Sequence, residues 1–422
     1  MDRGDVTESA PRQSPLATIR ELVGSPGRTH PYPRYELLRE HGAVIAVRPG
    51  LMVVVGYAEC DAALRDGRLR VQDGLSYDAI YPDWREHPAL RGYIDSMLYR
   101  NPPDHARMRR LVSSGFTPRR VNGLRPAIEQ LIDRLLDRLA EAGGAGAPVD
   151  FIAEFASQLP IAVISALLGV PEQDQAWFRR IAADVTIALE GITNLDALSV
   201  ADAAMRDLSA YFVALIERRG PEPADDVISV LAHSGAERLN QQELVANMML
   251  LLTAGFETTS FLLGHCLLLA CQHPDLARRL RAEPGFSVNY VEETLRFEAP
   301  VQATSRWAAT ELRLLGHPVP AGTKLVLILG AANRDPRRFA DPDRFDPDRG
   351  DIQPLSFGAG SHFCLGAPLS RMEAQIALPR LLRRFPELAL AGAPVRRDTW
   401  VGRGLDELPI RLGQKSPARA GA

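Results

Sequence analysis

The stretch LSFGAGSHFCLGAPLSR, residues 355–371, decides how the rest of the sequence is interpreted, because it places one cysteine in a glycine-rich turn that opens a helix. Glycines at positions 358, 360 and 366 allow the backbone to fold tightly around a ligand. Pro368 suits the first turn of that helix, which we predict to run from about residue 366 to about residue 385. Unpaired N–H groups and the helix dipole favour negative charge at a helix N-terminus, so we expect a lowered pKa for Cys364 and a sulfur available to a metal.

Length and composition limit the class of protein. The chain has 422 residues, 46% hydrophobic and 24% charged, which is enough to bury a large core and excludes global disorder. A net charge of −3 gives no reason to expect nucleic acid or an anionic membrane as a partner. We predict a single domain over residues 29–413, with a flexible N-terminal tail at 1–28 and a disordered tail at 414–422.

The cysteines and the N-terminus indicate a cellular compartment. Four cysteines in a chain of this length form no disulfide framework, which fits a reducing cytoplasm. The first residues are polar and acidic, without an apolar segment, so we expect no signal peptide and no membrane anchor. A lone cysteine usually packs as a small hydrophobe, and no set of Cys and His at zinc spacing surrounds Cys364.

Residues 245–271 form the longest apolar run in the chain and must be tested as a membrane span. Glu257 lies in the middle of the run, where a carboxylate in lipid would cost roughly 2.5 kcal/mol or more. A long helix through the core of a globular fold explains the pattern better.

The segment AGFETT, residues 254–259, interrupts this predicted helix with polar and flexible residues. Gly255 costs about 1 kcal/mol relative to alanine inside a helix. Thr258 follows Ala254 by four residues, so its hydroxyl can bond the Ala254 carbonyl and spread the helix locally. The result is a small polar notch in an apolar wall.

Together these motifs resemble the cytochrome P450 family. Phe357, Gly360, His362, Cys364 and Gly366 reproduce the pattern F-x-x-G-x-H-x-C-x-G of its haem-binding loop. The resemblance implies that Cys364 is the proximal thiolate ligand of haem iron, with Phe357, Gly360 and Gly366 against the cofactor.

The notch resembles the A/G-G-x-D/E-T-T/S signature of the same family. The resemblance implies that Ala254 lies beside the cofactor, that Thr258 is the oxygen-activating threonine and that Glu257 is its paired acid. The extra methylene of Glu, compared with Asp, leaves the route of the proton open.

Four basic residues are implied to hold the two haem propionates. The string NPPDHARMRR, residues 101–110, is similar to a family element that contributes His105 and Arg109. Arg306 and His362 complete the set. Buried carboxylates without such partners would be costly.

The resemblance also assigns residues to structure and to the substrate pocket. Glu293 and Arg296 match the family's Glu-x-x-Arg, and Arg344 in the later PDRF segment is expected to complete that network. Segments 71–96 and 172–219 are expected to cap the pocket. The expected pocket residues are Leu250, Thr253, Val301, Gln302, Thr304, Trp400 and Val401.

The implied fold is mainly α with a smaller β-rich region, an α+β cytochrome P450 fold with haem b between the long central helix and the helix after Cys364. The implied enzyme is a monooxygenase that inserts one atom of O2 into a C–H or C=C bond of an apolar molecule of terpenoid, polyketide or steroid type. No flavin or nicotinamide fingerprint is visible, so electrons from NAD(P)H are expected to arrive through a ferredoxin and its reductase. The enzyme itself is expected to be a monomer.

Two alternatives remain open from the sequence. Some proteins with this loop catalyse coupling, dehydration or rearrangement without oxygen insertion, and the threonine–acid pair argues against that chemistry. A haem carrier or gas sensor that is not an enzyme is the second, and such a protein has no need of the notch.

Overall fold

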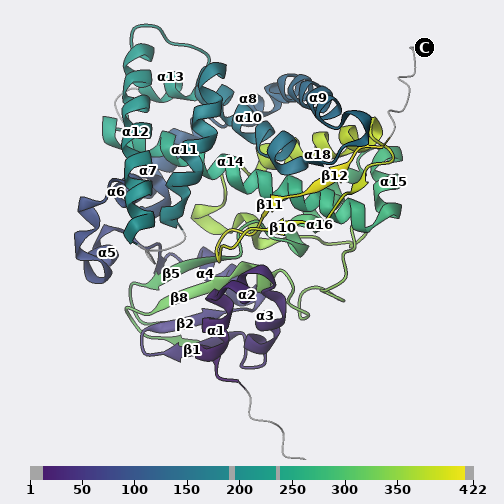
Figure 1. Cartoon of the computed structure of the whole chain (residues 1–422). Coiled ribbons are helices and arrows are strands. Elements are labelled where there is room, and N and C mark those ends of the chain that lie inside the picture. The colour runs from purple at the N-terminus through teal and green to yellow at the C-terminus, as the bar shows by residue number, and fades with distance from the viewer. Residues whose placement is uncertain (1–12, 190–194, 234–237, 414–422) are drawn as a thin grey trace, which may run out of the picture.

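A single long helix, α14 (Gln241–Gln272), crosses the middle of the computed structural model, and most other elements pack around it (Figure 1). Asn240 caps its N-terminus by accepting from the Glu243 N–H, while the Glu243 side chain accepts from the Asn240 N–H. The structure describes residues 13–189, 195–233 and 238–413. The helix is long and apolar enough to span a membrane, but 72% of its apolar window is buried inside the fold, so it serves as a core helix.

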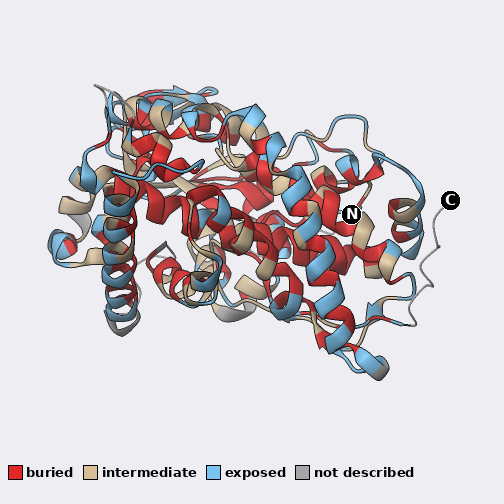
Figure 2. Cartoon of the chain, turned by 90° about the horizontal axis from the view of Figure 1, so that it is seen from above, coloured by how far each residue is buried: buried red, intermediate tan, exposed pale blue. Residues whose placement is uncertain are grey.

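Helices form most of the chain. Their bounds are α1 (Pro15–Val23), α2 (Ser25–Thr29), α3 (Tyr32–Arg39), α4 (Tyr57–Arg65), α5 (Gly74–Ile80), α6 (Pro88–Ile94), α7 (Asp104–Ser114), α8 (Pro118–Gly123), α9 (Arg125–Ala142), α10 (Gln158–Leu168), α11 (Gln175–Thr186), α12 (Leu195–Arg219), α13 (Val227–Ala232), α15 (Pro274–Ala282), α16 (Phe286–Phe297), α17 (Leu329–Ala332) and α18 (Ala367–Arg384). Buried residues concentrate in the interior of the molecule, on the inward sides of these helices (Figure 2). The predicted helix after Cys364 is confirmed as α18.

The sheets are small, and the five-stranded one lies to one side of the helical body (Figure 1). Their strands are β1 (Val44–Arg48), β2 (Leu51–Val54), β3 (Leu69–Arg70), β4 (Val149–Asp150), β5 (Ala303–Ala308), β6 (Leu312–Leu314), β7 (His317–Val319), β8 (Lys324–Ile328), β9 (Ala389–Leu390), β10 (Val395–Arg396), β11 (Leu405–Glu407) and β12 (Pro409–Arg411). The main sheet has the order β1-β2-β8-β5-β3, with β2 parallel to β8 and the other pairs antiparallel. Strands β10, β11 and β12 lie instead beside the helices α14, α16 and α18 (Figure 1). The predicted mainly α fold with a smaller β region is confirmed.

The N-terminal segment corrects one prediction. Residues 1–12 and 414–422 lie outside the described residues, but 15–29 form α1 and α2 instead of the flexible tail predicted for residues 1–28. Ser14 caps α1, and Leu22 is buried in a cluster with residues of α3 and the main sheet. Burial of this apolar side chain fixes the segment to the body.

Candidate active site

The cysteine loop folds around two glycines in the left-handed region. Gly358 has a φ of 69° and Gly360 a φ of 70°, conformations that residues with a side chain rarely adopt. A Cβ at Gly360 would lie 2.4 Å from the carbonyl oxygen of Leu64 in α4, so the loop must pass close to that helix. The Cys364 N–H donates to the Phe357 carbonyl over 2.9 Å, which closes the turn and places the sulfur just before α18.

The expected lowering of the Cys364 pKa was wrong for the protein alone. Burial raises the pKa of this thiol above its ordinary value, and the N–H groups of Gly366 and Ala367 together with Arg109 offset it only in part. Cys364 keeps some accessible surface. Even so, the packing of protein around the sulfur raises the pKa more than the N–H groups at the start of α18 lower it. A cation at the sulfur would reverse the balance, because metal binding favours the thiolate.

The polar notch forms as the sequence predicts. The Thr258 hydroxyl donates to the Ala254 carbonyl over 2.9 Å. The next residue, Thr259, donates to the Ser370 hydroxyl over 3.1 Å and so joins α14 to α18. Ser370 lies six residues after Cys364, in the first turn of the helix that follows the cysteine loop. The helix with the notch therefore contacts this helix directly.

The acid of the notch has a partner that the sequence did not reveal. The Glu257 carboxylate forms an ion pair with the guanidinium of Arg397, with 2.7 Å between Oε1 and Nη1. Arg397 directly follows strand β10, 140 positions later in the chain, so neither spacing nor helix periodicity indicates the contact.

The four predicted basic residues gather in one place. The rings of His105 and His362 stack with centroids 3.9 Å apart. Burial, then the charges of Arg109 and Arg306, lower the pKa of His105. Burial, then His105 and the same two arginines, lower the pKa of His362 to about 3. Burial also lowers the pKa of Arg306, to about 10.

This basic cluster fits an anionic cofactor. None of the four side chains has a carboxylate partner among the residues that the structure describes. The two arginines are cations without an anion in the described part of the chain, which is unfavourable in a buried site, whereas the lowered pKa leaves the His362 imidazole neutral and able to donate a hydrogen bond. Two propionates would supply the missing negative charge. Three or more Cys, His, Asp or Glu side chains gather nowhere in the described ranges in a way that would hold a metal. A single thiolate is suited to a metal whose other ligands come from its own cofactor ring, as in haem.

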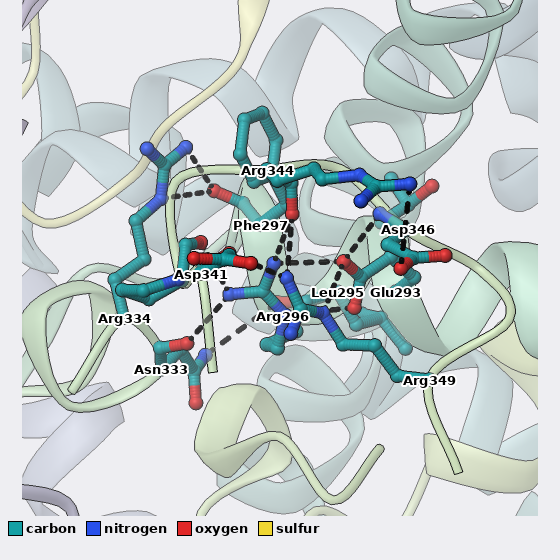
Figure 3. Close-up of polar contacts among 12 residues, drawn as sticks. Glu293, Leu295, Arg296, Phe297, Asn333, Arg334, Asp341, Arg344, Asp346 and Arg349 are labelled. Carbon is teal, nitrogen blue, oxygen red and sulfur yellow. Dashed lines mark hydrogen bonds and ion pairs between the residues drawn. The ribbon is translucent and has the colours of Figure 1, made fainter. Parts of the chain in front are cut away.

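The structural ion-pair network corrects a second prediction. Arg296 pairs with Glu293 at 2.7 Å, and both side chains are completely buried (Figure 3). The second arginine at Glu293 is Arg349, at 3.1 Å. The Arg344 carbonyl accepts from Arg296 and Arg349, while its side chain is 71% exposed and reaches Asp346 at 3.9 Å and not Glu293. Arg344 was therefore wrong as the network arginine, because its side chain leaves the turn toward solvent.

Two of the predicted pocket residues, Gln302 and Trp400, have contacts in the core. The Gln302 amide accepts from the Tyr35 hydroxyl at 2.8 Å and donates to the Ala299 carbonyl at 2.7 Å, so its polar end is held in the buried core. Trp400 packs against the apolar cluster of α1, α3 and the main sheet. Gln302 was therefore wrong as a pocket residue, because its amide is bonded inside the core, whereas the pocket role of Trp400 stays a prediction.

The remaining predicted pocket residues lie along α14 and the segments beside it. Thr253 is buried, donates to the Met249 carbonyl at 2.9 Å and accepts from Tyr93 of α6 at 3.4 Å. This contact brings the predicted capping segment onto α14. Val301 bridges to Gly402, next to Val401. Leu250 is buried, and Thr304 lies in β5 opposite Leu327.

Comparisons with known proteins agree with this geometry. The cytochrome P450 family model matches residues 205–284 and 287–405. The 6-deoxyerythronolide B hydroxylase of Saccharopolyspora erythraea is 37% identical over 411 residues, which cover 94% of this chain and 100% of that protein. The vitamin D(3) 25-hydroxylase of Pseudonocardia autotrophica is 38% identical over 397 residues, which cover 92% and 95%.

Solved structures give the same result. The structure of P450BioI in complex with an acyl carrier protein ligated to hexadec-9Z-enoic acid matches with a TM-score of 0.85 and 34% identity, over 93% of this chain and 99% of that one. Fold and site thus define a haem-dependent oxidoreductase. The chain belongs to the cytochrome P450 family, and it is a monooxygenase that uses haem iron, O2 and redox partners.

Proposed function

We propose that this enzyme inserts one atom of O2 into a C–H or C=C bond of an apolar molecule of middling to large size, of polyketide, steroid or terpenoid type. The observation that carries the proposal is the Thr258–Ala254 hydrogen bond beside Glu257, on a helix bonded directly to the cysteine helix. Proteins that only carry haem, and haem-thiolate enzymes that rearrange or couple substrates, do not require this pair. The names of the two hydroxylases above support the substrate class.

The chain's residues take distinct roles toward haem b. Cys364 ligates the iron through its thiolate. The basic cluster of His105, Arg109, Arg306 and His362 seats the propionates, because its two arginines have no carboxylate partner among the described residues and its two imidazoles can donate hydrogen bonds. Phe357, Gly360, Gly366 and Ala254 lie against the ring. When bound, the thiolate-ligated haem supplies the cleavage of the O–O bond.

The proton-handling residues belong to α14. The Thr258 hydroxyl donates its proton to the Ala254 carbonyl in the notch, and its oxygen can still accept a hydrogen bond at the helix surface. Glu257 carries the carboxyl that passes protons toward this hydroxyl. The buried apolar residues of α14, among them Leu250, keep bulk water from the site.

Electrons come from outside the chain. The sequence contains no flavin or nicotinamide fingerprint, which supports a ferredoxin and its reductase, driven by NAD(P)H, as the supply. The ferredoxin docks on the side of Cys364, where the path to the ligand is short. The enzyme acts as a monomer in the cytoplasm.

A substrate screen followed by isotope labelling tests the proposal. A library of polyketides, steroids and terpenoids is scanned for ligands that shift the haem from low spin to high spin, and the hits are incubated with a surrogate ferredoxin, its reductase and NADPH. Under oxygen-18 gas the product should gain one labelled oxygen atom. A product of unchanged oxygen content would favour coupling or rearrangement. NADPH oxidation that does not exceed that of the redox partners alone would favour a carrier or sensor.

A further inference from the structure

The partner of Glu257 comes from a hairpin near the C-terminus. Strands β10 and β11 pair antiparallel, and Arg397 lies in the connection directly after β10. Its guanidinium reaches α14 and pairs with the Glu257 carboxylate at 2.7 Å. The side chains are 27% and 16% exposed, so the pair is screened less than a fully exposed one.

The hairpin is fixed against α14 at this point. The Arg397 N–H donates to the Gly404 carbonyl over 3.2 Å. Gly404 lies so close to Phe261 of α14 that a Cβ at this glycine would be 2.0 Å from the ring. The Arg397 guanidinium also lies over the Phe261 ring, 5.5 Å from its centroid. The backbone of the hairpin and the ring thus determine where the guanidinium can be.

The loop of the hairpin, residues 397–404 between β10 and β11, is anchored separately. Arg403 forms a buried ion pair with Glu298 after α16, and its N–H donates to the Pro300 carbonyl over 2.8 Å. The Gln302 N–H donates to the Val401 carbonyl over 2.8 Å. Arg397 is therefore presented to Glu257 by a segment that is held at both ends.

We propose that Arg397 is a positioning residue for Glu257: it holds the carboxylate on the hairpin side of α14, next in sequence to Thr258. The inference rests on the proposed function and deepens it. Burial and, to a lesser extent, the charge of Glu257 raise the pKa of the Tyr93 phenol, whose hydroxyl donates to Thr253. Tyr93 cannot replace Arg397, because it carries no positive charge.

In this proposal the Glu257 carboxylate takes two positions during proton delivery. Paired with Arg397, the carboxylate is ionised and turned to the hairpin. To serve the notch it takes one proton from solvent water, leaves the guanidinium and releases that proton toward Thr258, after which the ionised carboxylate returns to Arg397. The carboxyl is unchanged over the cycle.

The test uses four variants of the holoenzyme with surrogate redox partners and a substrate from the spin-shift screen. Arg397→Met removes the charge and keeps the length, Arg397→Lys restores a charge, Glu257→Gln removes the acid, and a double variant combines Arg397→Met with Glu257→Gln. Arg411→Met, at an exposed position of β12, is the matched control. Product formed per NADPH, kcat, KM and peroxide release are measured.

We expect Arg397→Met to lower product per NADPH and kcat several-fold, with KM and the substrate-induced spin shift unchanged. Arg397→Lys should recover most of the loss, and the double variant should be no worse than Glu257→Gln alone, because both changes break one interaction. Effects that add, or a change in KM alone, would overturn the proposal. If no variant, wild type included, gives oxygenated product, the proposed function fails instead.

Unfolding of the same variants in urea gives a readout without turnover. The two single changes should shift the midpoint non-additively, and the Arg411 control should show no coupling with Glu257→Gln. Additive midpoint shifts would mean that the pair does not exist in solution, which also overturns the proposal.

Discussion

The Thr259 hydroxyl donates to the Ser370 hydroxyl over 3.1 Å and joins the helix of the polar notch to the helix that follows the cysteine. Thr259 is next to Thr258, and Ser370 is the fourth residue of α18. One hydrogen bond thus sets the register between the helix with the oxygen-handling residues and the helix with the proposed ligand. Such direct links between two rigid elements hold reacting groups in place better than loops do.

Cys364→Ser should abolish the red-shifted absorption band of the ferrous carbon monoxide complex. A serine oxygen is a weaker, less polarisable donor than a thiolate, so the electron donation behind the band is lost. The absorption difference spectrum checks this. Cys271→Ser, at a partly buried cysteine elsewhere, should retain the band. An intact band in the Cys364 variant would remove the assignment of the ligand.

Thr258→Ala should uncouple electron use from product. Without the hydroxyl that bonds the Ala254 carbonyl, proton supply to the notch is no longer ordered, so NADPH is consumed while product per NADPH falls, by roughly 10-fold or more. Product and peroxide are quantified together. Ser260→Ala, two residues further along the same helix, serves as the control and should stay coupled. An unchanged product yield for Thr258→Ala would contradict its role.

Arg349→Ala should destabilise the protein far more than Arg344→Ala. Removing Arg349 leaves the Glu293 carboxylate, which is completely buried, without one of its two arginines. Breaking a buried pair costs about 3–5 kcal/mol, whereas changes at exposed side chains stay within about 0.5 kcal/mol. Urea unfolding of the two variants checks this, and equal losses would restore the original assignment of Arg344.

His265 should make stability depend on pH. It is completely buried in α14, neither ring nitrogen has a hydrogen-bond partner among the described residues, and burial lowers its pKa to about 4. The unfolded chain takes up a proton near pH 6.5, so stability falls as the pH drops from 6.5 toward 4, by about 3 kcal/mol in total.

His265→Leu should remove this part of the acid sensitivity. The variant is compared with wild type by urea unfolding at pH values from about 7 down to about 4.5. At neutral pH it should be at least as stable, because two unpaired nitrogens leave the core. His317→Leu in β7, a partly exposed position, should keep the wild-type slope. A steep slope retained by His265→Leu would assign the effect to other groups.

Local sequence signals predicted the notch and the cysteine turn, whereas the basic cluster was expected from the family resemblance. The Thr258–Ala254 bond follows from four-residue helix spacing, and the cysteine turn follows from its glycines. The helix α1 also had a local signal that our prediction overlooked. Ser14 followed by Pro15 is a typical helix start, and the apolar residues after it repeat at helical spacing.

Other features depended on tertiary structure. The pairing of Arg397 with Glu257 requires the hairpin to cross α14, which no residue near either position indicates. The choice of Arg349 over Arg344 depends on which way each side chain leaves an irregular turn. The raised pKa of Cys364 depends on how much protein surrounds the sulfur, and that is a property of packing rather than of neighbouring residues.

The contact between Gly404 and Phe261 also limits how the enzyme can be re-engineered. Libraries that randomise the hairpin to accept other substrates should leave position 404 fixed, because even alanine would push the strand off the helix. A smaller side chain on α14 is needed first. Phe261→Leu would replace the ring and make the space that a bulkier hairpin needs. The order in which the two positions mutate therefore matters, and the ring must change first.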